Sequence, residues 1–367
     1  MKLGRYRLVA ELARGGMGVV WLAEARGVGG FGKTFVLKEL APEVARDDQY
    51  LAMFLEEARV AARLSHKNVV QTIDLGCDDG RWFMVLELLE GCTLARAAER
   101  ARIPHGLAAW IVSETLAGLH HAHEHGVVHR DVTPSNVFLC EGGEVKLLDF
   151  GLAKSRDAAR RTDHGIVKGS VAYLSPDHVA ESSIDRRADV FAAGVVLREL
   201  LTGERLWGDL EGGAIVRRLV ARDLPAFPAA PRVPAELRAI CERATAPYRR
   251  DRFPTALAMQ RALAAFTSPR GEAELRALFD DTLAPERDRA RNLLRSHPPA
   301  PPPPPVVLAS EDLVTWTPPP PARRRVAAAF LAFATLVFLF TAGMAVDHVA
   351  KREQHVSAPD WRARCNT

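Results

Sequence analysis

Two short stretches decide how this chain folds. They are His129-Arg130-Asp131-Val132-Thr133-Pro134-Ser135-Asn136 and Asp149-Phe150-Gly151. Asn136 follows Asp131 by five positions, and Asp149 follows it by eighteen. One carboxylate can accept a proton from a hydroxyl group, while the amide and the other carboxylate can hold Mg²⁺ against the phosphates of a nucleotide. At this spacing the two stretches predict phosphoryl transfer.

A glycine-rich segment and an isolated lysine come earlier in the chain. Residues 13–18 read Ala13-Arg14-Gly15-Gly16-Met17-Gly18, and glycines in a turn let backbone amides approach phosphate oxygens closely. A hairpin loop without a ligand would use the same residues. Lys38 ends an apolar run, and Glu57 lies nineteen positions further on. A lone lysine there is usually a solvated edge residue, but an ion pair with Glu57 would aim its ammonium at the α- and β-phosphates.

The apolar pattern changes along residues 1–268. Strand-like runs occur at residues 7–12, 19–24, 34–40 and 82–89. Helical periodicity occurs at residues 54–64, 107–125, 189–201 and 234–246. A β-rich first part followed by a mainly helical second part predicts an α+β fold with two lobes.

Residues 6–266 resemble the eukaryotic-like serine/threonine protein kinases of bacteria. Residues 12–18 are similar to the phosphate loop of that family, and residues 61–70 to the turn after its regulatory helix. The resemblance implies a two-lobed protein kinase fold with a β-rich N-lobe and a helical C-lobe. It also implies transfer of the ATP γ-phosphate to serine and threonine hydroxyls of proteins, including the chain itself, with ATP and Mg²⁺ as cofactors.

The resemblance assigns roles residue by residue. The implied catalytic residues are Asp131, Lys38 and Glu57, and the implied metal ligands are Asn136 and Asp149. Residues 85–91 resemble the hinge that binds adenine through its backbone, with Leu86 as gatekeeper. The implied nucleotide-binding residues are Leu12, Gly15, Gly16, Gly18, Val20, Lys38, Glu87 and Leu89.

Regulatory and structural roles follow in the same way. Arg130 resembles the arginine that contacts a phosphate on the activation segment, where Thr162 is the expected autophosphorylation site and Ser170 a further regulatory residue. A phosphate at Thr162 would pair with the basic side chains around it, although the segment also reads as a solvated basic loop. The implied structural residues are Asp177, Asp189 and Arg252, of which Arg252 would pair with Asp177.

Two positions depart from the family pattern. Ala13 stands where the first loop glycine is common, and Thr133 stands where most serine/threonine kinases have a lysine that contacts the γ-phosphate. Losing one charge-stabilising contact can lower a rate on the order of a hundredfold. These positions support an alternative function, a pseudokinase that binds nucleotide as a scaffold. A small-molecule phosphotransferase fits less well, because residues 169–177 resemble a platform for protein substrates.

Residues 326–346 contain no charged side chain, and Arg323, Arg324 and Arg325 come directly before them. As a helix this stretch would span about 30 Å, the thickness of a bilayer core. A buried core helix is the alternative. The positive-inside rule then places the N-terminal side in the cytoplasm, so we expect a single-pass protein of the cell (inner) membrane. The tail that follows is too short to fold alone as an extracellular sensor.

The expected parts are therefore a kinase domain at 1–268, a helical extension at 269–296, a proline-rich linker at 297–322, a basic flank with a transmembrane helix at 323–346, and a short extracytoplasmic tail at 347–367.

Composition limits the partners. The formal net charge of +4 comes without a basic cluster, so no nucleic-acid partner is expected. The five cysteines lack CxxC spacing, which favours neither a disulfide framework nor a zinc site. His121 and His125 are four apart on a predicted helix, and a metal site there is an alternative to plain helix packing. Expected partners are protein substrates and the membrane, with a homodimer left open.

Overall fold

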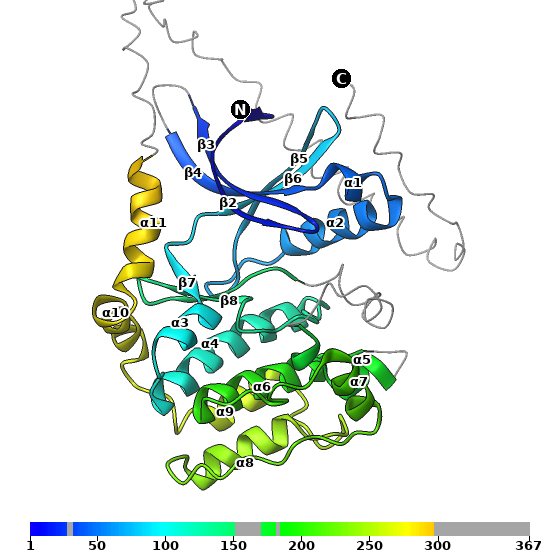
Figure 1. Ribbon diagram of the computed structural model, residues 1–367, viewed down its shortest axis with the longest axis vertical. Coiled ribbons are helices and arrows are strands. Elements are labelled where there is room, and N and C mark those ends of the chain that lie inside the picture. The colour runs from blue at the N-terminus through cyan, green and yellow to red at the C-terminus, as the bar shows by residue number, and fades with distance from the viewer. Residues whose placement is uncertain (28–31, 151–169, 181–183, 297–367) are drawn as a thin grey trace, which may run out of the picture. The chain divides into compact units, whose positions relative to one another are not determined.

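The computed structural model describes residues 1–27, 32–150, 170–180 and 184–296. All of them belong to one compact unit, Met1–Pro301. In this unit a β-sheet stands above a body of helices (Figure 1). The expected α+β architecture with two lobes is therefore confirmed.

The N-lobe is an antiparallel sheet with the strand order β1-β2-β3-β4-β6-β5. Its strands are β1 Lys2–Leu3, β2 Tyr6–Gly15, β3 Gly18–Arg26, β4 Gly32–Leu40, β5 Thr72–Asp78 and β6 Arg81–Glu87. Gly15 and Gly18 face each other across the turn between β2 and β3, so the glycine-rich segment is the tip of a hairpin. Gly18 has φ +156°, and a Cβ there would lie 1.9 Å from the carbonyl oxygen of Glu39, so only glycine fits.

Helix α2 (Asp48–Ala61) packs under this sheet. The side chain of Asp47 caps it by accepting hydrogen bonds from the backbone N–H groups of Gln49 and Tyr50. Its buried face includes Phe54 and Leu55, which join a core with residues of β4 and β6. The short helix α1 (Pro42–Ala45) leads into α2. This packing turns the Glu57 position of α2 toward the sheet.

The C-lobe is built around a helix that is buried along almost all of its length. Thirteen of the sixteen residues of α6 (Arg187–Thr202) are buried, as expected for a helix that is apolar on every side. Around it lie α3 Leu94–Arg100, α4 His105–Glu124, α5 Pro176–Ala180, α7 Gly212–Val220, α8 Ala235–Ala244 and α9 Ala256–Leu263. A small antiparallel sheet, β7 (Gly91–Thr93), β8 (Val137–Cys140) and β9 (Val145–Leu147), lies between this body and the N-lobe.

Residues 269–296 form two further helices, α10 (Gly271–Asp281) and α11 (Ala284–Ser296). Leu275, Phe279 and Leu283 are fully buried and belong to the main C-lobe core. A Cβ at Gly271 would lie 2.2 Å from the ring of Trp110, so the first turn of α10 lies directly against that indole. The extension that the sequence predicted is thus packed into the C-lobe.

Among the residues that the structure describes, no helix combines the length and apolar character that a membrane span requires. The stretch expected to span the membrane, together with the linker and the tail, lies outside the described residues. Membrane anchoring and the proposed division into parts remain predictions.

Candidate active site

Three charged side chains from separate elements meet at the cleft between the lobes. Lys38 of β4 places its Nζ 3.2 Å from Oε1 of Glu57 on α2 and 3.0 Å from Oδ1 of Asp149 after β9. Burial alone would lower the pKa of Lys38, but the carboxylates of Asp149 and Glu57 raise it above its ordinary value. The ammonium therefore stays charged and is held where it can meet phosphate oxygens.

The catalytic loop brings Asp131 and Asn136 together. Nδ2 of Asn136 donates to the carbonyl oxygen and to Oδ2 of Asp131, both at 2.7 Å. With its nitrogen engaged in this way, Asn136 keeps its amide oxygen as the atom that can bind a cation. Leu148 donates its backbone N–H to the carbonyl of Asn136, which ties the loop to the strand leading into Asp149. Amide and carboxylate oxygens suit Mg²⁺, so Asn136 and Asp149 fit the metal that the sequence implied.

A buried carboxylate fixes the backbone of the same loop. Asp189, on α6, accepts hydrogen bonds from the N–H groups of His129 and Arg130, both at 2.8 Å, and from Nε2 of His123 at 2.7 Å. Burial opposes its ionisation, but the bond from His123 and the nearby positive charges keep the pKa of Asp189 below its usual value. Arg130 adopts φ +68°, a conformation that these bonds hold in place.

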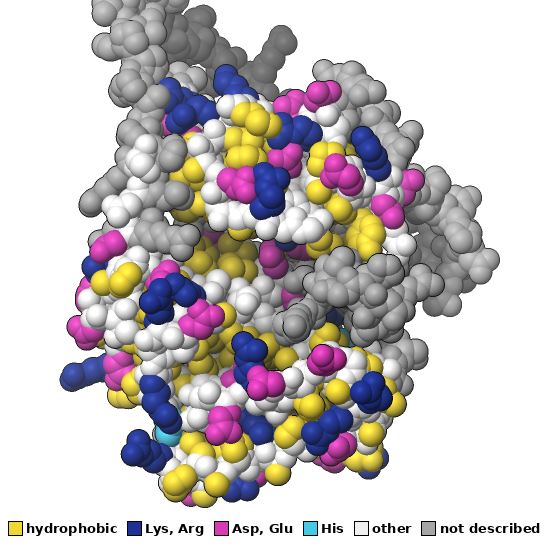
Figure 2. Space-filling model, in the orientation of Figure 1, with side chains coloured by type: hydrophobic (Ala, Val, Ile, Leu, Met, Phe, Trp, Pro, Cys, Tyr) yellow, Lys and Arg dark blue, Asp and Glu magenta, His cyan; other side chains and the backbone are white. Residues whose placement is uncertain are grey.

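Four of the eight nucleotide-binding residues predicted from the sequence, Gly15, Gly18, Val20 and Lys38, line one cavity of the N-lobe. A cavity of about 280 Å³ lies beneath the glycine hairpin and is lined by that hairpin, by Lys38 and Glu57, and by apolar side chains of Val44 and Phe54. A hollow between the sheet and the helices is visible in Figure 2. Leu12 is exposed on β2, and Val20 is partly buried on β3.

The hinge lies between β6 and β7. The Glu87 side chain accepts from Nζ of Lys146 at 2.6 Å and from the backbone N–H of Gln71 at 2.8 Å. That carboxylate is therefore already engaged by protein groups. Leu89 packs against the core beneath the sheet.

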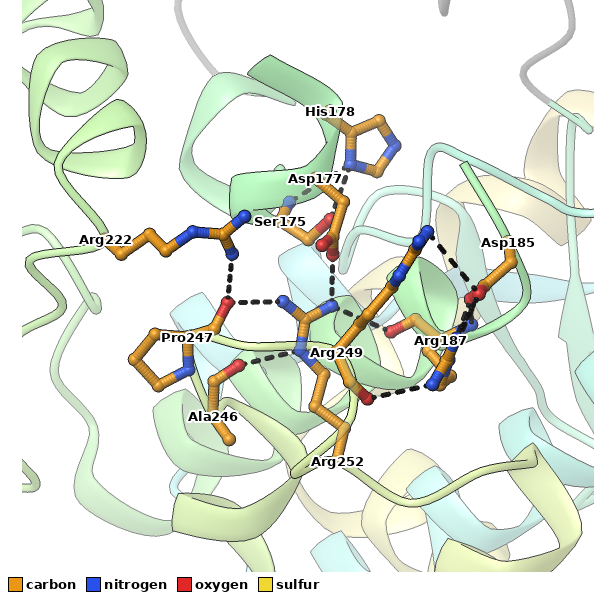
Figure 3. Close-up of polar contacts among 10 residues, drawn as sticks. All are labelled: Ser175, Asp177, His178, Asp185, Arg187, Arg222, Ala246, Pro247, Arg249 and Arg252. Atoms are coloured by element: carbon orange, nitrogen blue, oxygen red, sulfur yellow. Dashed lines mark hydrogen bonds and ion pairs between the residues drawn. The ribbon is translucent and has the colours of Figure 1, made fainter. Parts of the chain in front are cut away.

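The end of the activation segment is anchored by a buried ion pair. Arg252 Nη1 lies 2.5 Å from Oδ2 of Asp177, and both side chains are almost fully buried. Arg252 also donates to the backbone carbonyls of Ala246 and Pro247 (Figure 3). The shorter carboxylate of aspartate therefore reaches the arginine. Ser170 begins the 3-10 helix η3 (Ser170–Tyr173) just before this anchor, whereas Thr162 lies outside the described residues.

Two pairings were not anticipated from the sequence. The hydroxyl of Tyr173 donates to Oε2 of Glu199 at 2.7 Å, which joins η3 to α6. Burial raises the pKa of Glu199 in spite of this bond. The sequence did contain a signal for this pairing, namely the single glutamate of an otherwise mostly apolar helix. A buried carboxyl group needs a hydrogen-bonding partner. Lys146 with Glu87 is the second pairing.

The histidines form a stack. The rings of His66 and His121 lie 5.0 Å apart and nearly parallel, and those of His121 and His125 lie 4.4 Å apart. Among the described residues, no group of three or more histidine, cysteine, aspartate or glutamate side chains is arranged to hold a metal ion. The stack joins the turn after α2 to α4.

Comparison with known proteins agrees with this geometry. The protein kinase domain model matches residues 6–262. The chain therefore belongs to the protein kinase family, and the resemblance seen in the sequence is confirmed.

Its relatives include tyrosine-protein kinase MasK of Myxococcus xanthus, at 39% identity over 72% of this chain and 43% of that protein. Serine/threonine-protein kinase PknL of Mycobacterium tuberculosis is 36% identical over 77% of this chain and 67% of that protein. The crystal structure of the Mycobacterium tuberculosis PknI kinase domain matches with a TM-score of 0.57 and 27% identity over 73% of this chain and 98% of that one. The match thus covers less than half of MasK.

The buried ion pair at the end of the activation segment gives a first prediction. Asp177→Asn should lower the free energy of unfolding by about 3–5 kcal/mol, because it leaves the Arg252 cation buried without a counter-charge. Asp185→Asn is the matched control: it removes a half-exposed partner of Arg187 and should cost less than about 1 kcal/mol. Urea titration of both variants measures the difference. Equal effects would contradict the assignment.

The histidine stack gives a prediction about pH. Burial, and then neighbouring positive charge, lowers the pKa of His66 and of His121 in the folded chain. The unfolded chain therefore binds more protons below about pH 6.5, so the free energy of unfolding should fall as the pH drops from there. Urea titrations between pH 7.5 and 5 should show a shallower fall for His121→Gln. The control His105→Gln, at the other end of α4, should follow the parent, and identical slopes in all three proteins would refute the prediction.

Proposed function

We propose that this chain transfers the γ-phosphate of ATP to serine and threonine hydroxyls of proteins, itself included. The observation that supports this most is that Lys38 and Glu57 of the N-lobe meet Asp149 of the C-lobe side at the cleft, while Asp131 and Asn136 are hydrogen-bonded to each other in the catalytic loop. A scaffold that only binds nucleotide would not need a carboxylate held in place to receive a substrate hydroxyl.

Each residue of the site has its own role in phosphoryl transfer. Lys38, aimed by its two carboxylates, binds the α- and β-phosphates, and the hairpin backbone around Gly15 and Gly18 covers the phosphate oxygens. Asp131, whose carboxylate is oriented by Asn136, receives the proton of the acceptor hydroxyl. Mg²⁺, when held by Asn136 and Asp149, would neutralise the charge on the phosphates. The chemistry is then mainly positioning and electrostatic stabilisation.

We further propose that the chain is anchored in the cell membrane with this unit on the cytoplasmic side. The uncharged stretch 326–346 and the three arginines before it support this topology. Thr162, in a basic part of the activation segment, is our proposed autophosphorylation site, because a phosphate there would form charge-assisted hydrogen bonds with its neighbours.

The function is tested with purified chain, radiolabelled ATP and Mg²⁺, alongside Asp149→Asn. We expect label to enter the parent and a generic acceptor protein, and to fall by at least about a hundredfold in the variant, which loses a metal ligand. Acid hydrolysis of the labelled protein should release phosphoserine and phosphothreonine. Phosphotyrosine alone would instead indicate the activity for which MasK is named. Nucleotide binding without any transfer would establish the pseudokinase.

Thr133 gives a separate prediction about rate. Its side chain is buried beside Asp131 and carries no charge. Thr133→Lys should raise kcat by about tenfold or more, because it adds a cation near the transferred phosphate, while KM for ATP changes less. Thr133→Ser is the control and should stay close to the parent. Steady-state kinetics with a fixed acceptor protein distinguishes them, and an unchanged or lower kcat in the lysine variant would show that the cleft does not need this cation.

A further inference from the structure

The two helices beyond the family match lie against the strand that follows the hinge. The match ends at residue 262, whereas α10 and α11 continue to Ser296. In Figure 1 they lie along one side of the helical body, and α11 continues past the level of β7. Contacts between α11 and β7 confirm this arrangement. Because Leu283, between the two helices, is fully buried in the main core, the turn that sets the direction of α11 is fixed.

One carboxylate of α11 forms ion pairs with two arginines of α3. Oε1 of Glu286 lies 3.0 Å from Nε of Arg96 and 3.6 Å from Nε of Arg100. The Glu286 side chain is only 11% exposed, so this contact is better shielded than an ordinary surface pair. Burial first, and the Glu286 charge second, raise the pKa of Cys92 on β7 to about 11.

The same helix α3 touches the catalytic loop. The backbone N–H of Ala95 donates to the carbonyl oxygen of Pro134 at 2.9 Å, at a point between Asp131 and Asn136. Arg96 is the next residue, so the side chain that Glu286 holds belongs to the turn that makes this contact. A shift of α3 would move Pro134 with it.

The hinge side is equally constrained. β7 pairs with β8, and Gly91 adopts φ +146° so close to Leu139 that a Cβ would lie 2.0 Å from its carbonyl oxygen. The backbone N–H of Glu141 donates to the carbonyl of Glu90 in the hinge at 2.9 Å. β7 is thus held by β8 on one edge, while α11 contacts it from outside the sheet. The strand has little freedom unless α11 is displaced.

We infer that Glu286 is a positioning residue for nucleotide binding, acting through Arg96 and α3 on the hinge and the catalytic loop. Helices α10 and α11 are then part of the catalytic unit. The expected change in KM rests on the proposed function, whereas the expected change in Kd for an ATP analogue does not. Without the Glu286 charge, Arg96 would keep its exposed contact with Glu99, whereas the ion pairs that join α11 to α3 would be lost.

The test uses Glu286→Gln, which keeps the shape of the side chain and removes its charge. The matched control is Glu99→Gln, which removes an exposed partner of the same Arg96, 2.9 Å away. Kd for an ATP analogue with Mg²⁺, measured by fluorescence, and KM for ATP should both rise about three- to tenfold in Glu286→Gln, with kcat within about twofold, as expected for loss of a partly buried ion pair. Glu99→Gln should match the parent.

A charge swap keeps the inference testable if the single variant folds poorly. Arg96→Glu alone should weaken binding, and its combination with Glu286→Arg should restore Kd toward the parent. A lower midpoint of thermal unfolding in Glu286→Gln with unchanged Kd and KM would overturn the inference and leave Glu286 a purely structural contact. If the parent binds the analogue but transfers no phosphate, the proposed function fails while the Kd comparison still decides the role of Glu286.

Discussion

The buried carboxylate of Asp189 is the constraint on which the site depends. A charge removed from water is tolerated only when hydrogen bonds replace its hydration, and here backbone N–H groups of the catalytic loop supply them, together with His123. The loop therefore cannot relax without leaving that charge unsatisfied. Arg130 keeps a left-handed backbone conformation for the same reason. Asp131 follows directly, so its backbone is positioned by a residue of α6, while its carboxylate accepts from Asn136.

A second electrostatic link joins the two lobes. Lys38 comes from the sheet, Glu57 from the helix under it, and Asp149 from the C-lobe side of the cleft. The raised pKa of Lys38 reflects a cation stabilised by both carboxylates. Phe150 is buried with Leu64 and Ala122, and its ring lies 4.7 Å from that of His129. Phe150 is therefore held by packing and Asp149 by its ion pair with Lys38, which also pairs with Glu57 of α2. These contacts relate the position of α2 to that of the catalytic loop.

The sequence was sufficient for contacts that are local or carried by a motif. Asp131 with Asn136 follows from a spacing of five in one loop, and the two lobes follow from the change in apolar period. Pairings such as Tyr173 with Glu199, or Lys146 with Glu87, depend on which helix or strand comes to lie opposite, and periodicity does not contain that information. The helices of residues 269–296 carry a sequence signal for burial that was not used. Leu275 and Phe279 of α10 are four residues apart, share one face and are buried in the C-lobe core. That spacing was a readable signal for burial against the C-lobe.

Thr133 removes one cation from the cleft, which leaves phosphate charge to be stabilised by other groups. A lysine at this position would be a second fixed cation near the phosphates, and the cleft instead holds a buried neutral hydroxyl there. Lys38 is then the cation that the structure places at the cleft beside the oxygens of Asp149, close to the loop that carries Asn136. A site with fewer compensating charges depends more strongly on geometry, because each remaining contact must be well placed to act. Glu286 of α11 pairs with Arg96 and Arg100 of α3, and α3 is hydrogen-bonded to the catalytic loop at Pro134. The helices beyond the family match thus add contacts to the backbone beside the cleft, where the chain has threonine in place of a cation.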